Sequence, residues 1–128
     1  KYEIKVWDWN KPGNLKDLLT RLNRIRRENP ALQVTRNVRF CKINNDQLLA
    51  YYKATDDLSN IVLTVVNLDP RNTQSGWLEV PLDVFGINSA KAYPVQELLS
   101  GQQYFWQGGR ILLELAPSQA QAQIIRLK

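Results

Sequence analysis

The stretch IVLTVVNL, residues 61–68, is apolar on both faces for most of its length. A half-exposed strand alternates apolar and polar residues, so this run predicts a central strand that is covered on both sides. Polar turn segments separate it from further runs with strand character: VTRNVRFCKI (34–43), LLAYYKA (48–54), WLEVPL (77–82), AYPVQELL (92–99), QQYFWQ (102–107), RILLELA (110–116) and AQIIRLK (122–128). Several short strands at regular spacing are typical of an antiparallel β-sandwich. We therefore predict a mainly β fold.

Ahead of the strands, residues 14–29 have the periodicity of a helix. Apolar residues recur every three or four positions, which places them on one stripe of an amphipathic α-helix: Leu15, Leu18, Leu19, Leu22 and Ile25. Asn14 is a good N-cap, and Pro30 disfavours a helical conformation at Asn29. The sequence predicts one amphipathic α-helix in front of the sandwich.

Two glycine-containing segments lie between the predicted strands, and a single cysteine lies within one of these strands. Ser100–Gly101 and Gly108–Gly109 are interpreted as tight turns, because glycine tolerates the backbone conformations that such turns require. Cys41 lies inside a strand pattern and is interpreted as a small buried apolar residue.

Length and composition are those of one globular domain. The chain has 128 residues, of which 44% are hydrophobic and 23% charged. No apolar run reaches the roughly 20 residues that span a bilayer, so we expect a soluble protein that has no membrane partner. With one cysteine and no histidine, we expect neither a disulfide nor a metal site, and no cofactor. The absence of a secretion signal favours the cytoplasm, and the absence of Met suggests a piece of a longer protein.

The net charge of +5 raises the question of a polyanionic partner. The arginines of the predicted helix contribute much of it, but they spread around more than one face: Arg21, Arg24, Arg26 and Arg27. Without interleaved aromatic residues or a nucleic-acid motif, this pattern favours a solvated helix surface. A nucleic-acid partner is therefore not expected, and weak polyanion binding stays open as an alternative.

The sequence contains no recognisable catalytic set. Nucleophilic catalysis needs a serine or cysteine beside a base, and neither occurs here in a nucleophile motif. A spaced pair of carboxylates would suffice for glycoside chemistry, but the candidates are interpreted as solvent-facing turn or strand residues: Asp56, Asp57, Glu79, Glu97 and Glu114. We therefore expect no catalytic residue in this chain.

Four aromatic residues are candidates for stacking against sugar rings: Trp77, Tyr104, Phe105 and Trp106. A sandwich of this size also needs large side chains in its core, and that interpretation is the favoured one. A sugar platform near Trp77 or Trp106 remains the alternative.

Five segments, in order and spacing, carry a resemblance to a known family: KYEIKVWDW (1–9), LTRLNRIRRENPALQ (19–33), NNDQLLAYYK (44–53), VVNLDPRNTQSGWLEVPL (65–82) and ELLSGQQYFWQGG (97–109). Over essentially its whole length the chain resembles the C-terminal region of bacterial α-1,4-glucan:maltose-1-phosphate maltosyltransferases, which belong to the α-amylase superfamily. The helix and the VVNL strand are also similar to those of other α-amylase relatives.

This resemblance implies a division of the chain. In such enzymes a (β/α)8 barrel carries the chemistry and an antiparallel sandwich follows it, so residues 14–29 resemble the last helix of the barrel. The implied domains are residues 1–30, the tail of the barrel, and residues 31–128, the sandwich. The apolar stripe of the helix would then pack on the barrel, which is the implied partner.

The resemblance also implies a reaction for the longer enzyme. Maltosyl would pass from α-maltose 1-phosphate to an α-1,4-glucan with retention, using carboxylates that lie upstream of Lys1. The family's substrate-contacting Lys-Tyr pair matches Lys1 and Tyr2, although a frayed terminus is the favoured interpretation for the isolated chain. The longer enzyme is also expected to be a cytoplasmic homodimer. The alternative is a carbohydrate-binding or weakly polyanion-binding module.

Overall fold

A computed structural model describes residues 15–128, with Leu15 described by its backbone only. At its centre lies strand β3 (Ile61–Asn67), which pairs antiparallel with β2 (Leu48–Ala54) on one side and β8 (Ala122–Arg126) on the other. Every β3 residue except Val66 is buried. The prediction of a covered central strand is confirmed.

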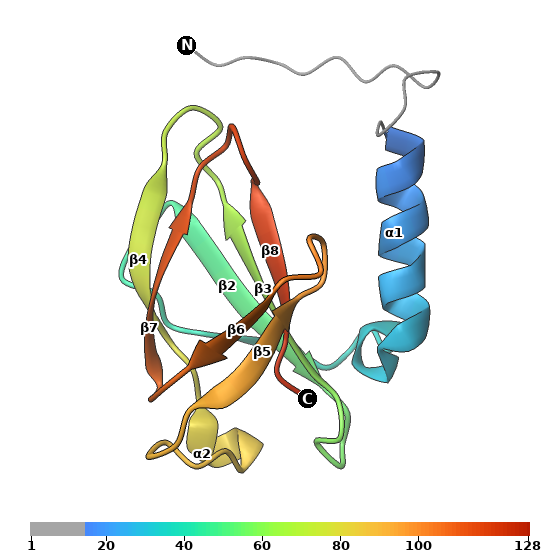
Figure 1. Cartoon of the computed structure of the whole chain (residues 1–128), viewed down its shortest axis with the longest axis vertical. Coiled ribbons are helices and arrows are strands. Elements are labelled where there is room, and N and C mark those ends of the chain that lie inside the picture. Colours follow the sequence, from blue (N-terminus) through green and yellow to red (C-terminus); the bar gives the residue numbers. More distant parts are fainter. Residues whose placement is uncertain (1–14) are drawn as a thin grey trace.

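The strands form two sheets that enclose the core (Figure 1). The larger sheet has six strands in the order β1-β2-β3-β8-β5-β6. Its remaining members are β1 (Val38–Phe40), β5 (Tyr93–Glu97) and β6 (Gln103–Trp106). The smaller sheet pairs β4 (Gln74–Glu79) with β7 (Arg110–Leu115). All pairings are antiparallel, so the predicted mainly β, antiparallel sandwich fold is confirmed.

A short segment, residues 41–44, connects the two sheets. The backbone N–H of Cys41 donates to Ala50 in β2, and the N–H of Glu79 in β4 donates to Lys42, both at 2.9 Å. The sequence predicts one strand over residues 34–43, but only Val38–Phe40 forms it. The prediction was wrong because the chain leaves the edge of the larger sheet after Phe40 and approaches β4.

Gly76 in β4 permits this close approach. A Cβ atom at this position would lie 3.1–3.2 Å from side-chain atoms of Ile43, Asn44 and Asn45. Such separations are shorter than ordinary van der Waals contacts, so a larger residue would displace the segment. The contact fixes the position of residues 41–44 against the smaller sheet.

Beyond β4 the chain forms one turn of helix, α2 (Leu82–Phe85), where the sequence pattern predicts that a strand continues to Leu82. Pro81 precedes the turn, and Gly86 ends it with a φ of +70°. The apolar residues Leu82 and Phe85 are buried. Their pattern therefore reflects burial in a helical turn, and the strand prediction for this part was wrong.

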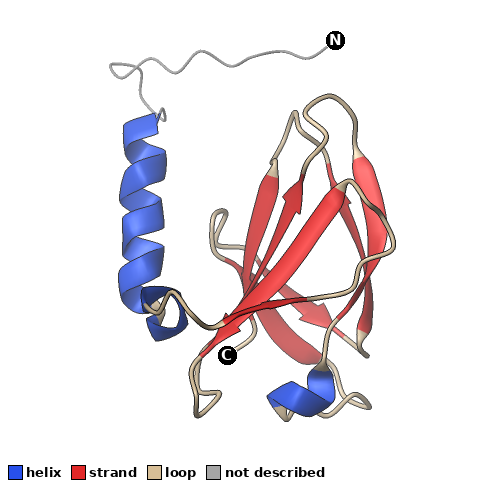
Figure 2. Cartoon of the chain, turned by 180° about the vertical axis from the view of Figure 1, so that it is seen from behind, coloured by secondary structure: helices blue, strands red, loops and turns tan. Residues whose placement is uncertain are grey.

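Helix α1 (Leu15–Glu28) stands beside the sandwich (Figure 2). It agrees with the predicted helix at its C-terminal end, where Asn29 adopts an extended conformation and the 3₁₀-helix η1 (Pro30–Gln33) follows. Asn14, the predicted N-cap, lies outside the described residues.

A buried pair of asparagines joins α1 to the sandwich. The side-chain N–H of Asn60, directly before β3, donates to Asn29 Oδ1 at 3.0 Å and to the backbone oxygen of Lys128 at 2.9 Å. Asn60 Oδ1 accepts from the backbone N–H of Ala31 at 3.0 Å. Asn29 in turn donates to the carbonyl of Ile25. One amide therefore ties the end of α1, η1, β3 and residue 128 together.

The predicted turns are present, but one of them has a different role. Gly101 and Gly108 have φ values of +78° and +76°, which glycine adopts without strain. Gly101 lies between the paired strands β5 and β6. Residues 107–109, by contrast, connect β6 in the larger sheet to β7 in the smaller one.

Glu97 at the end of β5 is buried, which contradicts its interpretation as a solvent-facing residue. Its carboxylate accepts hydrogen bonds from the backbone N–H groups of Leu99, Ser100 and Ile124 at 2.7–3.2 Å. These donors compensate for the loss of hydration and hold the β5–β6 turn against β8. Glu97 therefore has a structural role.

Candidate functional site

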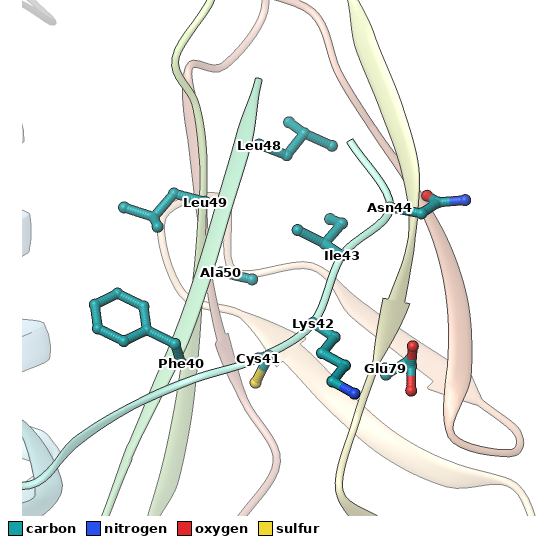
Figure 3. Close-up of a pocket in the computed structure, with 9 residues that line it drawn as sticks. All are labelled: Phe40, Cys41, Lys42, Ile43, Asn44, Leu48, Leu49, Ala50 and Glu79. Atoms are coloured by element: carbon teal, nitrogen blue, oxygen red, sulfur yellow. The ribbon is translucent and has the colours of Figure 1, made fainter. Parts of the chain in front are cut away.

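A surface groove lies between β2 and β4, along residues 41–44 (Figure 3). Its volume is about 450 Å³. It is lined by Phe40, Cys41, Lys42, Ile43, Asn44, Leu48, Leu49, Ala50 and Glu79. The register of the sheets places these residues together from three separate parts of the chain.

Apolar side chains dominate one part of this groove. Figure 3 shows Ile43, Leu48 and Ala50 between the ribbons of β2 and the 41–44 segment. Phe40 and Leu49 lie beside β2, and Phe40 is 71% exposed. The edge of the Phe40 ring packs toward Tyr51 on β2, with 6.4 Å between the ring centres. The Phe40 ring therefore offers an exposed aromatic surface on the side of β2 away from Ile43 and Ala50 (Figure 3).

Polar groups line the side toward β4, where Lys42 and Glu79 are exposed. Both also line a second hollow of about 380 Å³, together with Phe40, Cys41, Val80, Pro81 and Asp83. Because the two hollows share four lining residues, they adjoin one another. We call these two hollows together the trough.

Trp77 adjoins the trough from β4. Its backbone N–H donates to Asn44 Oδ1 at 2.7 Å, and its side chain is on the same face of the strand as that of Glu79, two residues further on. The ring is 41% exposed. The Arg110 guanidinium carbon lies 5.2 Å from the ring centre, and Leu112 faces Trp77 across the β4–β7 pair. Trp77 lines neither hollow, so it is an exposed aromatic residue next to the trough.

Cys41 is a half-buried member of the trough lining. Burial disfavours the charged thiolate and raises the pKa of the thiol to about 11. At neutral pH the group is therefore protonated and a poor nucleophile. Its interpretation as a small, largely apolar residue agrees with this environment, although it is not fully buried.

Among residues 15–128, no cluster of three or more potential metal ligands was found. In the same part of the chain, no helix is long and apolar enough to cross a membrane. What the trough offers chemically is a concave surface with apolar, aromatic and hydrogen-bonding groups, which is the composition of a binding site.

The structure separates the two tryptophans of the predicted sugar platform. Trp77 belongs to the smaller sheet, whereas Trp106 belongs to β6 in the larger one. Trp106 is half-buried and meets Tyr93 edge-on, with ring centres 6.4 Å apart. Lys1 and Tyr2, the predicted donor-site residues, lie outside the described residues.

The predicted barrel-packing stripe on α1 is covered unevenly. Ile25 is buried next to η1, Leu18 and Leu22 are half-buried, and Leu19 is 43% exposed. The side chain of Leu15 is outside the described set. Near the middle of the helix, the Arg21 guanidinium donates to the backbone oxygen of Leu99 in the β5–β6 turn. The N-terminal part of the stripe thus has apolar surface that the sandwich does not cover.

Sequence reasoning named Trp77 and Glu79 but missed Lys42 and Asn44. The signal that could have found them is Gly76, which interrupts a strand pattern beside Trp77 and indicates close approach by another segment. Which segment approaches is decided by sheet register, which no local pattern encodes.

Comparison with known proteins identifies similar sequences and folds. A family model described as "GLGE, C-terminal" matches residues 40–127. An α-1,4-glucan:maltose-1-phosphate maltosyltransferase of Chlorobaculum tepidum is 46% identical over 99% of this chain and 20% of its own length. The corresponding protein of Rhodospirillum rubrum is 45% identical over 99% of this chain and 18% of its own length. The chain thus spans about a fifth of these relatives.

Solved structures with a similar fold include α-amylases. One from Geobacillus thermoleovorans has a TM-score of 0.63 at 16% identity, covering 97% of this chain and 25% of that one. A maltogenic α-amylase from Thermotoga neapolitana has a TM-score of 0.60 at 13% identity, covering 91% of this chain and 27% of that one. At these identities the likeness concerns the fold alone.

Proposed function

The chain belongs to the GLGE C-terminal family, and from this premise we propose that it is the accessory C-terminal part of a maltosyltransferase. The observation that carries the proposal is the match of nearly the whole chain to about a fifth of much longer maltosyltransferases. In that longer enzyme, maltosyl would pass from α-maltose 1-phosphate to an α-1,4-glucan in α-glucan synthesis. This chain would contribute no catalytic residue.

The domain boundary proposed for the longer protein lies near residue 30. Residues 1–30 would belong to the catalytic barrel domain and residues 31–128 to the accessory sandwich. The sharp change of structure at Pro30, from α1 to η1 and then strands, supports this division. The Asn29–Asn60 contact would hold the two parts together at the boundary.

The stripe of α1 is the proposed contact surface with the barrel. Leu18, Leu19 and Leu22 retain exposure in this chain, although apolar helix stripes normally face a packed partner. A barrel surface would cover them and remove their apolar area from water. The catalytic domain of the same longer chain is therefore the proposed partner.

Lys1 and Tyr2 are proposed to contact the donor in the longer enzyme. A lysine ammonium and a tyrosine hydroxyl can donate hydrogen bonds to phosphate or sugar oxygens. This role comes from the match of the two residues to the family pattern. The longer enzyme is further proposed to be a cytoplasmic homodimer that needs no cofactor.

The isolated chain is expected to be inactive. Incubated with α-maltose 1-phosphate and a maltooligosaccharide, it should release no phosphate above a buffer control. The reason is that a retaining transfer needs two positioned carboxylates, which we place outside this chain. Phosphate release that scales with protein concentration would contradict the accessory role.

The helix surface is tested by the double substitution Leu18→Lys with Leu22→Lys. If the stripe is a docking surface without its partner, the isolated chain self-associates through it, and two lysines reduce the dimer fraction in analytical ultracentrifugation. The β-sheet circular dichroism signal should remain. Thr20→Lys with Asn23→Lys adds the same charge at exposed positions and serves as the control. Unfolding by the first pair alone would place the stripe in this domain's own core.

A further inference from the structure

We propose that the trough, with the adjoining Trp77 ring, is a non-catalytic binding site for an uncharged α-glucan chain. The choice of α-glucan rests on the proposed function, whereas the location and the polar, uncharged character of the ligand rest on the structure. Neither the family match nor the names of the relatives assign a site to this part of the chain.

The aromatic rings provide the first argument. A pyranose ring presents C–H groups on its faces and hydroxyls around its rim, so its faces pack well on an aromatic ring. Trp77, 41% exposed, lies on the outer face of β4 next to the trough, and its backbone N–H donates to Asn44. Phe40, 71% exposed, lines both hollows at β2, with its ring on the side of β2 away from Ile43 and Ala50 (Figure 3). Exposed aromatic rings at a concave surface are characteristic of ligand sites.

The polar groups provide the second argument. The Lys42 ammonium donates hydrogen bonds, the Glu79 carboxylate accepts them, and a sugar hydroxyl can do both. Both residues line each hollow, so they lie at the middle of the trough. Asn44 is fixed beside them by its bond to Trp77. The mixture of donors and acceptors suits a row of hydroxyl groups.

Charge distinguishes this ligand from a polyanion. Lys42 and Arg110 are offset by Glu79 and Asp83 around the trough and Trp77. A site for phosphate or sulfate groups would instead show an excess of positive charge. The balance of charges therefore favours a neutral polymer.

The position of the site provides the third argument. In Figures 1 and 2, β4 and β7 lie on the side of the sandwich away from α1. If α1 packs on the catalytic domain, the outer face of β4 stays accessible in the longer enzyme. A glucan held there remains near the enzyme, which raises its effective concentration for transfer.

Isothermal titration of the 128-residue chain with maltoheptaose tests the site. We expect weak binding that Trp77→Ala and Glu79→Gln each reduce about tenfold, because the first removes the stacking ring and the second replaces a charged hydrogen-bond acceptor with a neutral amide. Phe105→Ala is the matched control, since this ring is 75% exposed on β6 outside the trough and its loss should leave binding unchanged. Circular dichroism verifies that each variant is folded.

Alkylation of Cys41 gives a second readout that depends on location. Cys41 lines both hollows, so saturating maltoheptaose should slow the reaction of its thiol with iodoacetamide at pH 9, and Trp77→Ala should weaken this protection. Cellohexaose, with β-1,4 links, should protect less, and heparin should not compete.

Three results of the titration would overturn the inference. These are no binding of maltoheptaose up to about 10 mM, an equal loss of affinity in Phe105→Ala and Trp77→Ala, and displacement of the glucan by heparin. Self-association blocked by Trp77→Ala, without glucan binding, would identify the surface as a contact between copies and also overturn it. Each result can occur while the phosphate and helix tests still support the accessory role, so the two proposals fail separately.

Discussion

Helix α1 carries an apolar stripe and strand β3 is apolar over most of its length, yet the two meet opposite environments. From Ile61 to Val65 every residue of β3 is buried, whereas Leu19 of α1 remains 43% exposed. The sandwich therefore buries its own apolar residues, whereas part of the apolar stripe of the helix stays exposed to solvent. An apolar pattern in the sequence therefore predicts that a residue set packs against another surface. It does not say whether that surface belongs to the same domain or to a different one.

Truncation of a core side chain should lower the free energy of unfolding more than any other change considered below. Leu63 is fully buried at the centre of β3, so Leu63→Ala removes packing and leaves a cavity, and we expect it to lower the free energy of unfolding by about 2–5 kcal/mol. The same truncation at Leu19 should change it by no more than about 0.5 kcal/mol. Urea unfolding followed by circular dichroism measures both. Equal decreases in the free energy of unfolding for the two variants would contradict the proposed difference between β3 and α1.

Loss of the Asn60 side chain, which connects α1 to the sandwich, should lower the free energy of unfolding by an intermediate amount. Asn60→Ala leaves Asn29 Oδ1, the N–H of Ala31 and the oxygen of Lys128 without their shared partner, which we expect to cost about 1–3 kcal/mol. Hydrogen exchange should quicken more at Ala31 than in the middle of β3.

A surface asparagine provides the control for this variant. Asn88 is exposed and its side chain accepts a local hydrogen bond from the backbone N–H of Ala90, so Asn88→Ala should be close to neutral. If Asn60→Ala left exchange at Ala31 unchanged, the amide would not be what joins α1 and η1 to the sandwich.

Lowering the pH should change the free energy of unfolding least, through two carboxyl groups in turns of the sandwich. Hydrogen bonds from Ser59 and Thr55 lower the pKa of Asp57 to about 2, and those from Arg71, Asn72 and Gln74 lower that of Asp69 to about 2. A carboxyl with a lowered pKa in the folded state stabilises the fold above its unfolded pKa near 3.9, and this contribution is lost as the pH falls toward 2. Asp57→Asn and Asp69→Asn should each reduce the loss of stability in that range.

Carboxyl resonances in an NMR titration measure these pKa values directly. Both lie in turns remote from α1 in sequence, so the exchange rates of the helix amides should not follow the same titration. Midpoints near 4 for both groups would show that the hydrogen bonds do not persist in solution.

Much of the fold follows from local sequence pattern. Helix α1 ends where Pro30 requires, and β3 is central because its residues are apolar on both faces. Each of these features depends on residues that are close along the chain. For the same reason, the glycines at 101 and 108 were predictable as turns.

Features that depend on distant contacts could not be predicted. The segment after Phe40 has strand character but turns toward β4, and the apolar residues Leu82 and Phe85 fill the core from a helical turn. Glu97 has the charge of an exposed residue, yet backbone donors from Leu99, Ser100 and Ile124 make its burial stable. The trough exists only because sheet register places residues 40–44 beside Glu79.

The β2–β3 hairpin has a consequence for the order of folding. Its seven facing pairs are joined by a short turn that Asp57 closes with Thr55 and Ser59, whereas β8 reaches β3 only after the whole intervening chain is placed. Local pairing costs less loop entropy, so the hairpin should form in the transition state and the β3–β8 pairing after it. In stopped-flow experiments, weakening the turn at Asp57 should slow refolding, while Ile125→Val in β8 should mainly speed unfolding. The opposite pattern would assign the nucleus to the long-range pairing.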